Sequence, residues 1–154
     1  MEISLTIKKL DVLNEVGRAT AYYGTASGEG APGYDTAAAT PDDRELLETY
    51  WRGAKNDVLR LSQRFAPLEL SAAKNNQTAD EQEDFTLKLT MPSTWDTATL
   101  DALTNAVRLY LVHDITAKWA VRAIPSAAEV MATQSTADAS TITQLLHHTK
   151  RPTD

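Results

Sequence analysis

The three histidines carry the most versatile chemistry in this sequence, and their spacing decides what they can do. His113 is followed directly by Asp114, and His147 and His148 are neighbours. Adjacent helical residues point about 100° apart, so this pair lacks the four-residue spacing with which helical histidines chelate a metal. We therefore expect no metal site. The pair His147 and His148 suits a helix C-terminus, where the macrodipole favours positive charge, and His113 suits a partly buried position with a polar partner.

Other residue types that support catalysis are missing or poorly placed. The chain has no cysteine, which excludes disulfides, thiolate zinc sites and thiol catalysis. Ser27 lies in no Gly-x-Ser-x-Gly motif, and the glycine-rich stretch 24–33 lacks the Gly-Lys-Ser/Thr ending of a phosphate-binding loop. The carboxylates cluster at a helix start, residues 42–48, and at a polar stretch, residues 80–84, as expected for solvated surfaces. We predict a protein that is not an enzyme and binds no cofactor.

Length, composition and net charge further limit the class of protein. A chain of 154 residues suits one domain, and 42% hydrophobic residues is an ordinary globular composition. The net charge of −6 argues against a general nucleic-acid binder. No apolar run approaches the length of about 20 residues that a membrane span needs, and the opening residues form no signal peptide.

The N-terminal third combines a strand, a helix and a loop. Residues 2–8 alternate between apolar and polar side chains, which predicts a half-buried strand. Asp11 is the expected cap of a short helix, and Gly24 its expected end. Residues 24–39 hold four of the six glycines and only one large anchor, Tyr34, so we expect a long flexible loop.

The most regular pattern predicts a second helix over residues 41–65. Thr40 and Pro41 provide a cap and a first-turn proline, and apolar residues follow at spacings of three and four. Acidic residues come first in this segment and basic residues last. The basic set is Arg52, Lys55, Arg60 and Arg64. It could form a basic stripe for nucleic acid, but complementation of the helix dipole already explains it.

Two further alternating segments, 68–71 and 85–91, predict strands. They form either a hairpin with a long acidic tip over residues 74–84 or two edge strands around a flexible excursion. The sheet is therefore expected to be antiparallel, with two or three strands. The sequence leaves open whether strand 2–8 pairs within the chain or with another subunit.

Two helices complete the expected fold. The capping pattern at 93–96 introduces a third helix that runs to about Ala123, and its wide apolar girth predicts a central position. Pro125 should end it, and Ser126 should begin a fourth, serine- and threonine-rich helix that depends on docking to a neighbour. The expected fold is mainly α with a small antiparallel β element, an α+β bundle of about four helices. It forms one domain over residues 1–149, with a frayed tail at 150–154.

Some large side chains are expected inside and others at an interface. The predicted core contains Leu47, Trp51, Val58, Leu111 and Trp119. The interface candidates are aromatic residues near loops and basic residues of the tail. They are Tyr22, Tyr34, Trp95, Lys150 and Arg151.

The order of these segments resembles a known class of proteins. It runs from Ile3-Ser4-Leu5-Thr6-Ile7 through Tyr22-Tyr23-Gly24-Thr25 and the helix opening at Thr40-Pro41-Asp42-Asp43 to the closing Lys150-Arg151-Pro152. It is similar to small structural proteins of tailed phages and prophages of gut bacteria, of the head-completion or head–tail adaptor type. The N-terminal strand departs from that plan, since such adaptors typically begin with a helix.

The resemblance implies a non-enzymatic virion component. It implies a neck or tail-adaptor subunit that forms a ring, contacts other copies of itself, portal and tail proteins, and is assembled in the bacterial cytoplasm. It implies no membrane contact and no specific nucleic-acid binding, although an acidic surface could line a channel through which DNA slides. The alternative is a small acidic regulator or inhibitor that binds a host protein.

Overall fold

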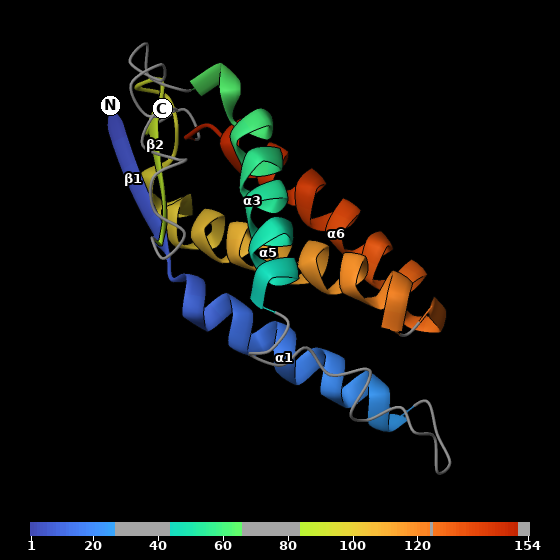
Figure 1. Cartoon of the computed structure of the whole chain (residues 1–154). Coiled ribbons are helices and arrows are strands. Elements are labelled where there is room, and N and C mark those ends of the chain that lie inside the picture. Colours follow the sequence, from blue (N-terminus) through green and yellow to red (C-terminus); the bar gives the residue numbers. More distant parts are fainter. Residues whose placement is uncertain (27–43, 66–83, 124, 151–154) are drawn as a thin grey trace.

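The computed structural model describes residues 1–26, 44–65, 84–123 and 125–150. In chain order these residues form β1 (Glu2–Ile7), α1 (Lys9–Ala26), α3 (Arg44–Leu61), η2 (Gln63–Phe65), β2 (Phe85–Thr90), η3 (Thr97–Thr99), α5 (Leu100–Ala123) and α6 (Pro125–Leu146). Four helices and a small antiparallel sheet confirm the predicted α+β class (Figure 1). The expected strand 68–71 lies outside the described residues, as do loop residues 27–39 and 74–83.

The two described strands pair with each other, so β1 finds its partner within the chain. Ile3 lies opposite Leu89, and Ile7 lies opposite Phe85. The alternation of side chains places Leu5, Ile7 and Leu87 on the buried face and leaves the polar residues between them exposed. This register buries one face of each strand, which explains why apolar and polar residues alternate in both segments.

The start of α1 differs from the prediction. The helix begins at Lys9 instead of after Asp11, which lies in its first turn. The main-chain N–H of Lys9 donates to Asp84 Oδ1 at 3.0 Å, so a carboxylate 75 residues away in sequence satisfies it. Because Ile7 pairs with Phe85, Asp84 lies where the chain leaves the sheet and enters α1. The helix also continues past Gly24, so residues 24–26 belong to it and not to a loop.

Helix α5 is the centre of the molecule, as its apolar girth predicts. It contacts α1, α3, α6 and β1, and α6 lies antiparallel beside it over most of its length (Figure 1). All five predicted core residues, Leu47, Trp51, Val58, Leu111 and Trp119, are buried. At the turn, Pro125 is the first residue of α6 and not the residue that ends α5, because proline suits the first position of a helix.

Candidate functional site

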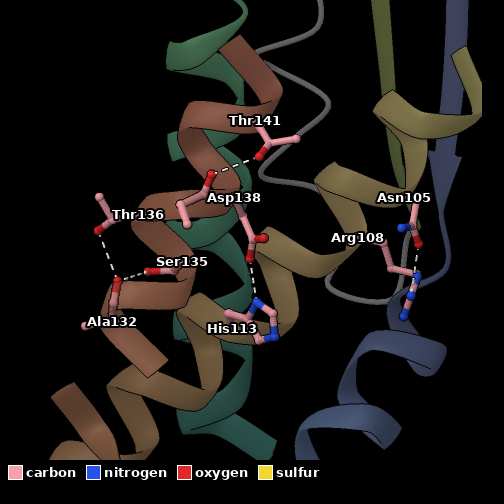
Figure 2. A network of polar contacts seen from close by, with 9 residues as sticks. Asn105, Arg108, His113, Ala132, Ser135, Thr136, Asp138 and Thr141 are labelled. Carbon is pink, nitrogen blue, oxygen red and sulfur yellow. Dashed lines mark hydrogen bonds and ion pairs between the residues drawn. The ribbon is translucent and has the colours of Figure 1, made fainter. Parts of the chain in front are cut away.

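The imidazole of His113 makes the shortest polar contact between α5 and α6. Its Nδ1 lies 2.5 Å from Asp138 Oδ2, and the two side chains are 23% and 17% exposed. Figure 2 shows the pair in the gap between the two helices, with Ser135 one turn away on α6. The Ser135 hydroxyl donates to the Ala132 carbonyl at 2.9 Å instead of to the imidazole. The pair therefore holds the two helices in register, and its neighbouring serine is not arranged as a nucleophile.

A second polar seam joins α3 and α5. The Tyr110 hydroxyl donates to Asp57 Oδ2 at 3.2 Å, and next to it on α5 Asp114 Oδ2 forms an ion pair with Lys118 Nζ at 2.9 Å. Burial raises the pKa of Asp114 above its usual range, and the Asp57 charge adds to this rise, while Lys118 opposes it. Burial, followed by the charges of Asp114 and Asp57, also raises the pKa of Tyr110. Tyr110 is thus held as a neutral phenol that crosslinks two helices.

A buried ion pair ties the start of α1 to α3. Lys9 Nζ donates to Glu48 Oε1, and both side chains are less than a tenth exposed. A more exposed pair, Arg108 and Glu15, joins α1 to α5 at 2.5 Å. The contacts Lys9–Glu48, Arg108–Glu15 and Tyr110–Asp57 link different helices and fix them relative to one another, whereas Asp114 and Lys118 pair within α5.

Trp95 corrects one of the interface predictions. The side chain is 1% exposed, and its indole Nε1–H donates to the Leu145 carbonyl at 2.9 Å. It is therefore a core residue that anchors the end of α6, not an aromatic offered to a partner. A tryptophan between a proline-containing turn and a helix start gives no local signal that distinguishes these two roles.

The C-terminal segment is also more ordered than predicted. Trp95 and Thr149 form an antiparallel bridge. The Lys150 N–H donates to the Thr94 carbonyl at 2.8 Å, and the Asp96 N–H donates to the His148 carbonyl at 3.2 Å. The prediction of a frayed tail is thus wrong for Lys150, although its side chain is exposed and stays an interface candidate.

The remaining interface candidates stay predictions. Tyr34 and Arg151 lie outside the described residues. Tyr22 lies within α1, but its side chain is not among those described.

Sequence reasoning missed the outward surface of α6. From Val130 to Leu146 the helix contains one ionisable residue, Asp138, and that carboxylate is bound to His113. The exposed positions of this stretch carry alanine, serine, threonine, glutamine and valine. Four of these residues bond back to the carbonyl four positions earlier, namely Thr133, Thr136, Thr141 and Thr143. Their hydroxyl protons are used within the helix, which leaves a surface of methyl groups and neutral oxygens. The signal in the sequence is the near-absence of charged residues over this stretch.

Comparisons with known proteins do not identify a family for this chain. No family model, curated protein or solved structure matches the chain. Within the described ranges no three metal-ligating side chains come together, and none of the helices there has the length and apolarity to cross a bilayer.

Proposed function

We propose that this protein is a non-enzymatic assembly component of a tailed-phage virion, a neck or head–tail adaptor subunit that forms a ring with copies of itself. Its partners are then neighbouring copies, the portal and tail proteins, and its place is the virion after assembly in the bacterial cytoplasm. The resemblance in the order of its elements supports this class.

The observation that carries the proposal is the uncharged outward face of α6. A helix on a free protein surface usually carries many charged residues. Depletion of charge is instead the compositional mark of the central part of a protein–protein interface. The uncharged stretch of α6, residues 130–146, is about 25 Å long at 1.5 Å per residue, which is long enough for a subunit contact.

A ring requires each subunit to offer two different surfaces, since head-to-tail contacts close around a rotation axis. The α6 face would supply one of them. The alternative, a regulator of a host protein, also uses a surface of this kind, but it needs only one contact and predicts a monomer. The number of copies in the particle therefore separates the two functions.

The test is the native mass of the purified full chain, alone and mixed with the portal protein of the same phage. We expect a multimer of defined size in at least one of these samples. Placing two charges on the face, with Ala137→Lys and Thr141→Lys, should abolish that species. Asn14→Lys and Thr49→Lys add the same charge at exposed positions on α1 and α3 and should preserve it. A chain that stays monomeric in both samples would overturn the proposal.

A further inference from the structure

The C-terminal half of α3 presents a cationic surface that the proposed assembly does not use. Arg52, Asn56 and Arg60 are spaced four residues apart and are exposed, and Gln63 and Arg64 continue the exposed surface through η2. We call these five residues the α3 ridge. The Arg60 side chain is 75% exposed. From Arg52 to Arg60 the part of the ridge on α3 extends about 12 Å at the rise of an α-helix.

The segment that carries this ridge is mainly basic, although Glu45 and Glu48 precede Arg52 on the same helix. Between Tyr50 and Phe65 the chain has four basic residues and a single acidic one, Asp57. Asp57 is held by the Tyr110 hydroxyl and by Arg60, whose Nη2 donates to it at 3.0 Å. An arginine has five N–H donors, so this bond leaves Arg60 able to bind an anion as well. Complementation of the helix dipole accounts for cations in the last turn only, and Arg52 lies well before it.

The negative charge of the whole protein does not cancel this field. Salt screens exposed charges over about 8–10 Å, so a ligand at the ridge responds mainly to the groups next to it.

The neighbours of the cations identify the class of ligand. Among the described side chains of α3 and η2, the exposed ones are all polar: Glu45, Thr49, Arg52, Asn56, Arg60, Gln63 and Arg64. A protein partner is normally bound through apolar or aromatic anchors with few charges at the centre. Single-stranded nucleic acid needs exposed aromatic rings for stacking, whereas Trp51 is 1% exposed and Tyr50 and Phe65 are only partly exposed, the latter packed against the His147 ring. Arginine, asparagine and glutamine side chains are the usual ligands of a duplex phosphate backbone.

We infer that the α3 ridge binds the phosphate backbone of double-stranded DNA without sequence preference. Three arginines supply the charge, and Asn56 and Gln63 supply amide donors between them. The inference goes beyond the proposed function and does not depend on it, since the ridge and the α6 face belong to different helices.

The test is fluorescence anisotropy of a labelled 30-base-pair duplex titrated with the full chain at 50 mM salt. Non-specific duplex binding typically has a dissociation constant of about 10⁻⁴–10⁻⁶ M at physiological salt, and we expect a value in or below this range at 50 mM. The affinity should fall about 40-fold between 50 and 200 mM salt, because three neutralised phosphates give a log–log slope of about −2.7. Two duplexes of unrelated sequence should bind equally well.

Two matched triple variants distinguish the contribution of the α3 ridge from the effect of net charge. Arg52→Gln, Arg60→Gln and Arg64→Gln together should weaken binding at least tenfold. Lys8→Gln, Lys88→Gln and Arg122→Gln remove the same charge at exposed positions elsewhere and should change the affinity less than threefold. Circular dichroism checks that both triple variants fold, and single substitutions replace any variant that does not.

Several results would overturn the inference. These are no binding at 50 mM salt, equal loss in the two triple variants, and tighter binding of single-stranded DNA or of a polyglutamate peptide than of the duplex. The assembly proposal is tested separately, by the native mass of the chain. Failure to bind DNA would therefore leave the assembly proposal intact, and a monomeric chain would leave the DNA-binding inference intact.

Discussion

At the scale of single residues, the charges inside this protein are used to hold helices together. Lys9 and Glu48 are paired at the contact of α1 with α3, and Asp114 and Tyr110 lie in the seam between α3 and α5. A buried charge is costly unless it is paired. The loss of one partner should therefore cost far more than the loss of the pair.

The Lys9–Glu48 pair gives the first prediction. Lys9→Met leaves the Glu48 carboxylate buried without its lysine and should lower the free energy of unfolding by about 3 kcal/mol. The double variant Lys9→Met, Glu48→Leu should recover most of this loss. Arg108→Met removes a cation from a pair that is one-third exposed, and it should cost no more than about 1 kcal/mol. Urea denaturation measures all three. A double variant as unstable as the single one would show that the pair is not the source of the effect.

The raised pKa of Asp114 gives a prediction with a defined sign. The unfolded chain loses this proton near the ordinary aspartate pKa of about 3.9, while the folded chain keeps it to higher pH. Asp114 therefore lowers the free energy of unfolding as the pH rises from that value through its raised pKa. Asp114→Asn removes this loss, so the variant should gain stability relative to the wild type across that window and keep the gain at pH 7. Asp101→Asn, exposed on the same helix, serves as the control.

At the scale of elements, the sequence predicted what repeats locally and missed what depends on distant partners. The alternation in residues 2–8 and 85–91 and the apolar spacing in 41–65 identified β1, β2 and α3, because each pattern reflects one buried face. The start of α1 was placed wrongly because its main chain is capped by Asp84, which no local pattern indicates. Trp95 was assigned to the surface for the same reason.

The attachment of the C-terminal segment should depend on Trp95. Trp95→Phe keeps most of the ring but removes the Nε1–H that binds the Leu145 carbonyl. We expect hydrogen exchange to become at least tenfold faster at the amides of Lys150 and Asp96, which bond across this attachment. The buried amides of α3 should change much less. Equal acceleration throughout the protein would indicate general destabilisation and would contradict a local role.

At the scale of the whole molecule, the two outward helices present opposite kinds of surface. The exposed part of α6 from Val130 to Leu146 is uncharged, whereas the exposed part of α3 is entirely polar and mainly cationic toward its end. A subunit that binds neighbours through one surface and a polyanion through another would have this division. The candidate site on α6 could have been found from the sequence by its missing charges, but its outward orientation required the structure.

The salt dependence of binding should distinguish the α6 face from the α3 ridge in a single series of measurements. Contacts between uncharged groups are insensitive to ionic strength, and excluded salts strengthen them if anything. Contacts with phosphates weaken steeply with added salt, because the release of counterions from the DNA then contributes less free energy to binding. Raising the salt from 50 to 300 mM should therefore leave the native mass of the assembly unchanged while duplex binding falls by about two orders of magnitude. If the assembly dissociates over the same range as the DNA, then charged groups hold the subunits together, and the uncharged face of α6 is not their contact.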